Sequence, residues 1–437
     1  MKIRYIGTAA LLSCALLFSG CTNTPATDVS HEPASSDISS AAQSSVPEAK
    51  KHYITLSKNE SYDIPAGDNP RKFSSADTNI ASVNSSGTVT GVSEGKTEIS
   101  VISDEIVTDI YIVTVNKSVY EQSLPSAPES SEGEENRITP AVWEVTTTGG
   151  NTVYMMGSIH VGDTDIFYMP DYYNAAFSRC SALAVECDTT KLDLLETASY
   201  IDKYLYTDGT MISDHVSEKA YNNAKEILKK YGRYTSQTDR YKPMLWTQYL
   251  EICSADEIGL SSDYGVESIV MAEASKKGKQ ILELESVQFQ MQLLTSFDDR
   301  LQEALFETYA NDDTFDKAVK SMDEMYSKWK SGTLTAEDVG AETDYSEYYS
   351  DNMTAEEHAE ADELKKLYED YNKKMLDDRN AGMEKKIKGY LDDGKTVMVV
   401  VGSGHFYGDN GIISLLEKDG CTVKSLSSAD TSRLKAQ

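Results

Sequence analysis

The chain carries little positive charge for its length. Its 437 residues include 41 Lys and Arg against 71 Asp and Glu, which gives a formal net charge of −30. A protein this acidic is repelled by phosphate backbones. We therefore expect no nucleic-acid partner.

Cysteine is also scarce. Of six cysteines, two lie near the N-terminus, and the others show no CxxC pair and no dense framework. The other four are Cys180, Cys187, Cys253 and Cys421. A disulfide is permitted outside the membrane, but the sequence does not decide whether one forms.

Several catalytic motifs are missing. The chain has no HExxH, and it has no GxSxG, P-loop or GxGxxG sequence in the strand-to-helix setting that these motifs require. These absences remove support for a zincin, a serine hydrolase or a nucleotide-dependent enzyme. Past the N-terminal segment, no run of residues is long and apolar enough to span a bilayer.

The N-terminus has the order of an export signal. Lys2 and Arg4 precede a mostly apolar stretch from Ile6 to Phe18, and Ser-Gly-Cys21 follows. This is the secretory pattern, and it is too short for a lasting transmembrane helix. A Cys after Ser-Gly resembles the lipobox of bacterial lipoproteins; the alternative is an ordinary signal with a chance Cys. We expect residues 1–20 to be removed and Cys21 to be lipidated, holding the protein at the extracytoplasmic side of the cell membrane.

Two polar tracts divide the rest of the chain. Residues 21–50 and 117–137 are rich in Ser, Pro and small or acidic residues and cannot bury a core, so they indicate a disordered tether and a linker. Between them, 51–116 alternates short apolar runs with turn residues, which predicts a small antiparallel sandwich. The run Ser74–Val101 resembles the second group of bacterial Ig-like domains. We interpret this module as a spacer rather than as an adhesion domain.

Residues 138–437 alternate apolar strand-like runs with helical periodicity. This pattern predicts an α/β domain whose sheet is covered on both faces, with a largely helical insertion from about Phe297 to Leu391. The expected strands are Val153–Met156, Ala182–Val185, Ile281–Leu284, Val397–Val401 and Thr422–Leu426. The fold class is thus multi-domain, with an all-β Ig-like sandwich followed by an α/β domain.

Two histidines stand out among the six in the chain. His160 and His405 each follow an apolar strand-like run, and each has a Gly three residues earlier, Gly157 and Gly402. Ligands bind beyond the carboxyl ends of strands in α/β sheets, and Gly allows an unusual backbone angle or a close approach. We expect both histidines at that edge. His215 is expected to be structural and His358 to be exposed.

Acidic residues follow two further strands. Glu186 ends ALAVE and Glu285 ends ILELE, so both carboxylates should reach the same edge of the sheet. Two His with one or two carboxylates is a common plan for a catalytic divalent metal such as Zn, Mn or Co. The alternative is that each Glu caps the next helix. Arg379 and Asn380 could contact substrate or a developing oxyanion, or simply lie on a surface helix.

The domain from about Ala141 is similar to the TraB/GumN family, which is related to the TIKI metal-dependent proteases. The resemblance rests on AVWEVTTTGGNTVYMMGSIHVG, SALAVECD, YGVESIVMAEASKKGKQILELESVQFQ, LDDRNAGMEKKI and VMVVVGSGHFYGDNGIISLLEKDG. It implies that His160, His405 and Glu186 hold the metal, and that Glu285, Arg379 and Asn380 complete the catalytic site.

Together these features favour a surface-anchored, metal-dependent hydrolase that acts on an extracellular peptide or protein. In that case Glu285 would serve as a ligand or a general base. The alternative is a non-catalytic protein that binds an extracellular peptide or sequesters a pheromone, with the same residues lining a polar pocket.

Overall fold

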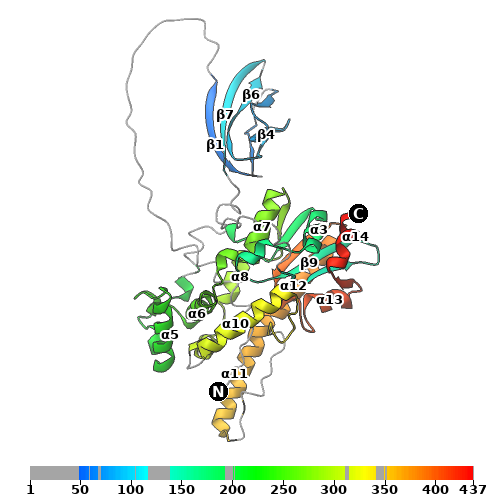
Figure 1. Cartoon of the computed structure of the whole chain (residues 1–437). Coiled ribbons are helices and arrows are strands. Elements are labelled where there is room, and N and C mark those ends of the chain that lie inside the picture. Colours follow the sequence, from blue (N-terminus) through cyan, green and yellow to red (C-terminus); the bar gives the residue numbers. More distant parts are fainter. Residues whose placement is uncertain are drawn as a thin grey trace, which may run out of the picture. The chain divides into compact units, whose positions relative to one another are not determined.

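A computed structural model describes residues 49–116 and 138–436, except for 59, 67–69, 104, 192–199, 201, 311–313, 341–348 and 350–351. The predicted signal peptide, Cys21, almost all of the tether and the linker 117–137 lie outside these residues. The described chain forms two compact units (Figure 1).

The first unit is a two-sheet β-sandwich (Figure 1). One sheet has the strand order β1-β7-β6-β3 and the other β2-β5-β4. Inward-facing residues such as Leu56, Val89, Ile99 and Val113 are almost fully buried and form one core. The strands are β1 (Lys50–Ser57), β2 (Ser61–Asp63), β3 (Lys72–Ser75), β4 (Ala81–Val83), β5 (Thr88–Gly91), β6 (Gly95–Ser103) and β7 (Ile106–Asn116).

The sandwich differs from the expected antiparallel arrangement at one pair of strands. β1 pairs with β7 in parallel, in register from Lys50 opposite Asp109 to Ser57 opposite Asn116. These are the first and last strands of the unit, so no hairpin fixes their relative direction. An apolar/polar alternation is the same in parallel and antiparallel strands, and only the path of the whole chain decides between them.

The second unit is built on a six-stranded sheet with the order β11-β10-β12-β9-β8-β13. The four strands from β11 to β9 are parallel, whereas β8 runs antiparallel to both β9 and β13. The strands are β8 (Val142–Thr146), β9 (Thr152–Ser158), β10 (Ala182–Val185), β11 (Gln280–Glu283), β12 (Val397–Gly402) and β13 (Thr422–Ser425). Each expected strand is present; β8 was not expected.

Helices cover both faces of this sheet. One face packs on α12 and α13 through Val399, Met383 and Ile412. On the other face, Arg433 of α14 bonds Glu144 of β8. Central strands are therefore apolar on both sides, as their uninterrupted Val and Met runs indicate. The fold class predicted from the sequence is confirmed.

The helices of this unit flank the sheet or form a helical region (Figure 1). This region begins earlier than the predicted Phe297, because the helices at 218–230 and 243–257 pack in one core with those at 299–310 and 314–331. The helices are α3 (Asp171–Arg179), α5 (Glu218–Lys230), α6 (Pro243–Glu257), α7 (Val266–Lys276), α8 (Val287–Leu294), α9 (Asp299–Ala310), α10 (Thr314–Ser331), α11 (Ala355–Asn372), α12 (Asp378–Asp392), α13 (Ile412–Lys418) and α14 (Thr431–Ala436). Among the described residues, none of the helices combines the length and the apolar character that crossing a membrane requires.

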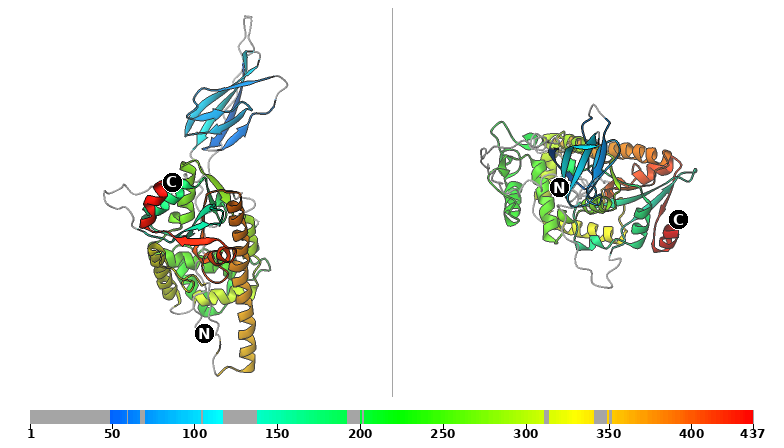
Figure 2. Two further views of the ribbon diagram at one scale, coloured as in Figure 1. Left: turned by 90° about the vertical axis from the view of Figure 1, so that its right-hand side faces the viewer. Right: turned by 90° about the horizontal axis from the view of Figure 1, so that it is seen from above.

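One long rod runs from α11 into α12 (Figure 2). A π-helical turn, η8 (Lys373–Asp377), joins the two, and the Asp378 N–H donates to the Lys373 carbonyl five residues earlier. Such π turns hold one extra residue and are frequent at functional sites. Here the turn lies directly before Arg379 and Asn380.

The helical region contains a buried acid away from the sheet edge. Glu251 of α6 is fully buried, its Oε1 accepts from the Tyr309 hydroxyl at 2.9 Å, and its Oε2 has no hydrogen-bond partner among the described residues. Burial raises the pKa of Glu251 well above its ordinary value. Ionising this carboxyl in the folded state is therefore costly.

We predict that Glu251→Gln stabilises the protein at pH 7 by about 1–3 kcal/mol. The folded-state pKa is raised, so wild-type stability falls as the pH rises above the unfolded-state pKa of about 4.3. The gain should therefore disappear below about pH 4. Urea unfolding of the full chain, followed by tryptophan fluorescence at both pH values, measures it.

Glu226→Gln on the surface of α5 is the matched control, because Glu226 is 73% exposed. Its effect should stay within about 0.5 kcal/mol. A Glu251→Gln protein less stable than wild type at pH 7 would show that the ionised carboxylate is stabilised in the fold.

Candidate metal centre

The sheet topology brings four of the predicted residues to one edge. β11, β10, β12 and β9 are adjacent and parallel, so their carboxyl ends lie side by side. Glu285, Glu186, His405 and His160 follow these four strands in that order across the sheet. All four side chains are at least nine-tenths buried.

The glycines before the two histidines are required by close packing. A Cβ on Gly402 would lie 2.9 Å from Glu186 Oε1, and a Cβ on Gly157 would lie 2.6 Å from Ser403 Oγ. Neither glycine has a positive φ. The sequence allowed two reasons for these glycines, an unusual backbone angle or a close approach. The structure shows that the close approach applies. The Gly402 N–H also donates to Glu186 Oε1 at 2.6 Å.

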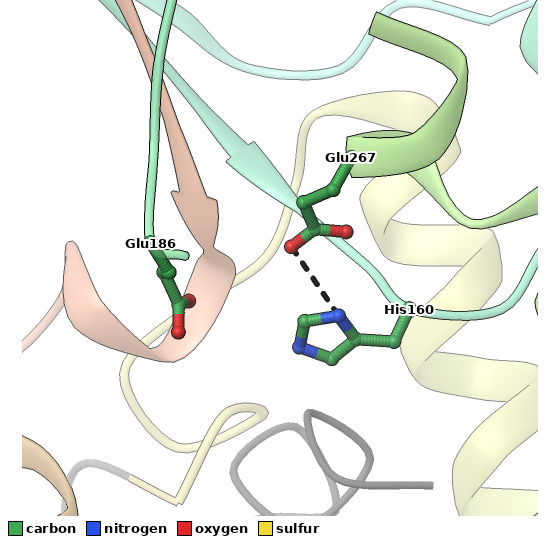
Figure 3. Close-up of side chains that lie close together, drawn as sticks. All are labelled: His160, Glu186 and Glu267. Atoms are coloured by element: carbon green, nitrogen blue, oxygen red, sulfur yellow. Dashed lines mark ion pairs between the residues drawn. The ribbon is translucent and has the colours of Figure 1, made fainter. Parts of the chain in front are cut away.

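Among the described residues, His160, Glu186 and Glu267 form a group of possible metal ligands (Figure 3). One ligand atom from each lies within 4.8 Å of the others, and all three residues are buried. His160 Nδ1 is 3.3 Å from Glu267 Oε1. Glu267 Oε1 also accepts from the Ser158 hydroxyl, whereas its buried Oε2 has no hydrogen-bond partner in the part of the chain described.

Glu267 was not predicted from the sequence as a site residue. It lies in the first turn of α7, where an acidic side chain is ordinarily explained by the helix dipole. Gly265, two residues earlier, packs closely on the site, because a Cβ there would lie 2.8 Å from the His160 carbonyl oxygen. The start of α7 thus packs directly on the first GxxH turn, but only the folded chain reveals this contact.

Arg379 links the two strand-end carboxylates. Its Nη2 donates to Glu186 Oε2 at 2.6 Å and to Glu285 Oε2 at 2.8 Å, and its Nε donates to Glu285 Oε1 at 3.1 Å. Its Nη1 donates to the Met375 carbonyl at 3.2 Å. Gln290 Nε2 donates to both carboxylates, at 3.1 and 3.0 Å. With its guanidinium so engaged and 3% exposed, Arg379 is better placed to position these carboxylates than to contact substrate.

Asn380 fixes the ring of His405. Its Nδ2 donates to the Asn410 carbonyl at 2.9 Å, which sets the amide orientation and turns Oδ1 toward His405 Nδ1 at 2.6 Å. His405 Nδ1 must therefore carry the proton of the neutral ring, leaving a lone pair on Nε2. That Nε2 is 3.6 Å from Glu186 Oε1. Asn380 is thus a positioning residue for the second histidine.

The buried charges shift several pKa values. Burial alone would raise the pKa of Glu186, but His405, Arg379 and His160 lower it to about 2. Burial and then Arg379 lower the pKa of His405 to about 3, so its ring is neutral at pH 7. Burial lowers the pKa of His160, but Glu267 outweighs this and raises it above its ordinary value.

The donor set fits a divalent metal. Imidazole nitrogens and carboxylate oxygens suit Zn, Mn or Co. Glu186 and Glu285 share the one guanidinium of Arg379, and the third buried carboxylate, on Glu267, lies beside His160, so the carboxylates outnumber the guanidinium. A buried charge excess is costly unless a cation offsets it. The unpaired Oε2 of Glu267 is an available ligand atom.

The other two histidines of this unit, predicted to be structural (His215) and exposed (His358), lie apart from this group. His215 stacks on Tyr206 with ring centroids 4.1 Å apart and bonds Thr210, while His358 is exposed on α11. The four cysteines of the described chain are free.

Comparison with known proteins gives the family. The TraB/PrgY/gumN family model matches residues 141–425, well over half of the chain. The chain belongs to this family. A bacterial Ig-like domain of group 2 matches residues 58–115. The resemblances of the two domains to the TraB/GumN family and to the group 2 Ig-like domains are thus confirmed.

Relatives of the TraB/PrgY/gumN domain occur in two bacteria. The uncharacterized protein YbaP of Escherichia coli (strain K12) and that of Shigella flexneri are each 21% identical to this chain over 285 residues, which is 64% of this chain and 94% of the relative. The crystal structure of a termite-gut GH10 xylanase with a bacterial Ig-like domain also aligns with this chain, at 12% sequence identity. The alignment covers 84% of this chain and 99% of the xylanase chain. Its TM-score of 0.16 is too low to support an argument.

We predict that Arg379→Met lowers the free energy of unfolding by about 3–5 kcal/mol, because it leaves Glu186 and Glu285 buried without their shared cation. Urea unfolding at pH 7 measures the loss. Adding Glu285→Gln to Arg379→Met removes one of the two unpaired charges and should recover part of the stability.

Arg433→Met is the control. Arg433 also binds a carboxylate, Glu144, through two hydrogen bonds of 3.0 and 2.9 Å, but its side chain is 37% exposed. We expect a loss of at most about 1 kcal/mol. Equal losses in the two variants would contradict the role assigned to burial.

Proposed function

We propose that this protein is a metal-dependent hydrolase of extracellular peptides. The observation that carries the proposal is the buried group of His160, Glu186 and Glu267, with ligand atoms within 4.8 Å of one another and an unpaired carboxylate oxygen. His405 offers its Nε2 to the same group from the next strand. A divalent metal held there would polarise a substrate carbonyl and activate water for attack.

The surrounding residues keep the ligands ready in this proposal. Arg379 keeps Glu186 ionised and fixed in direction, and the Gly402 N–H holds its second oxygen. Asn380 holds the His405 ring with its lone pair on Nε2. Glu285 has both oxygens bonded to Arg379, which supports a positioning role over the ligand or general-base role expected from the sequence.

The proposed place of action is the outer side of the cell membrane, with Cys21 as the lipid anchor. This part of the proposal rests on the N-terminal sequence alone, because Cys21 lies outside the described residues. At this location the domain would meet extracellular peptides as substrates rather than cytosolic nucleotides.

We predict that the purified full chain binds a divalent metal and that His160→Ala and His405→Ala each lose the metal and peptide cleavage. Glu267→Gln should weaken metal binding by at least about tenfold. Metal content is measured by elemental analysis after dialysis, and cleavage by mass spectrometry of a mixed peptide library. A chelator should abolish cleavage, and restored metal should return it.

His215→Ala is the matched control, since it removes a histidine of the same unit that lies away from the group. It should keep both metal and cleavage. Unchanged metal content in His160→Ala and His405→Ala would refute the proposed centre. Saturable peptide binding that survives chelation and yields no products would instead support the alternative of a peptide-sequestering protein.

A further inference from the structure

A cavity of about 280 Å³ adjoins the candidate metal centre. Its walls are the end of α11, the π turn η8, and the loop Tyr407–Gly411 that follows the second GxxH motif. Drug-sized ligands occupy pockets of roughly 300–1,000 Å³. The cavity therefore suits one side chain or one terminus of a peptide rather than a complete small molecule.

The cavity is connected to the site through Asn380. This residue lines the cavity, yet its amide bonds both His405 Nδ1 and the carbonyl of Asn410, which also lines the cavity. Gly404, the neighbour of His405, lies in the same wall. A group held in the cavity would therefore sit next to the residues that fix the second histidine.

The charges of the lining are unequal. Glu369, Asp377 and Asp409 contribute carboxylates, whereas Lys373 is the single cation of the described lining, and its ammonium is paired with Asp378 outside the lining. Neither the Asp377 nor the Asp409 carboxylate has an ion pair among the described residues. A carboxylate-lined recess favours a positively charged group and rejects a negative one.

The π turn η8 explains why the cavity and the buried site lie next to each other along one helix. It places Asp377 at the cavity, while Arg379 and Asn380, slightly further along the same helix, face the buried carboxylates and His405. The extra residue of a π turn rotates the part of the helix that follows it. In a regular helix, Asp377 could not face the cavity while Arg379 and Asn380 face the buried site. One helix thereby serves both the site and the cavity.

We propose that this cavity is a specificity subsite that takes a cationic group of the peptide, a Lys or Arg side chain, beside the point of cleavage. The inference rests on the proposed function, because it assigns the substrate class of the same site. The net charge of −30 adds to it by attracting cationic peptides over longer distances.

The test uses the metal-loaded full chain and quenched-fluorescence hexapeptides, acetylated and amidated at their ends, in which each position in turn is Lys, Leu or Glu. We expect one position at which Lys peptides are cleaved at least about tenfold better than Glu peptides by kcat/KM. In the double variant Asp377→Asn, Asp409→Asn this preference should fall to near unity with metal content unchanged.

The matched control is Asp316→Asn, Asp323→Asn, which removes the same charge from exposed positions on α10. The control should retain the preference for Lys over Glu peptides. Both double variants lose the same net charge and so the same long-range attraction, but only the cavity variant loses carboxylates from the recess. A preference that persists in the cavity variant, or that falls equally in the control, overturns the inference. Divalent metal lost from the cavity variant alone would assign the recess to a second cation instead.

Failure of the proposed function is recognised separately. If no peptide is cut although the metal is bound, the same peptides are tested for binding by fluorescence anisotropy. Tighter binding of Lys than Glu peptides, lost in the cavity variant, would still support the subsite. Equal affinities, or no binding of any peptide, overturn it.

Discussion

A buried guanidinium between two carboxylates is the interaction on which the candidate site depends. Arg379 reaches Glu186 and Glu285, which follow neighbouring strands, and it is itself anchored to the Met375 carbonyl. Three charged side chains are tolerated in the interior only because each is hydrogen-bonded by another. The rod formed by α11 and α12 is thereby joined to the carboxyl edge of the sheet.

This interaction leaves a charge excess that gives the site its chemical character. Arg379 neutralises one carboxylate, but Glu186, Glu267 and Glu285 are all buried within the same region. A raised pKa at His160 and an unpaired oxygen on Glu267 are two signs of the same excess. A divalent cation is the simplest group that would offset it, which is why the donor set and the electrostatics favour the same proposal.

Glycine sets how closely these parts approach. The Gly157 turn meets Ser403, Gly402 meets Glu186, and Gly265 meets the His160 backbone, each too closely for a Cβ. The two GxxH turns are therefore packed against each other and against the start of α7. Larger residues at these positions would separate the histidines from the carboxylates without altering any functional side chain.

The sequence by itself determined the two domains, the five strands expected in the α/β sheet and the placing of His160, His405, Glu186 and Glu285 at one edge, because strand ends and their order along the chain are local features. It could not identify Glu267, whose position in a first helical turn has an ordinary local explanation, nor the parallel pairing of β1 with β7. It also left open whether Arg379 meets substrate or carboxylates. Tertiary structure decided these points, since each depends on contacts between segments far apart in the chain, which residue type and spacing do not encode.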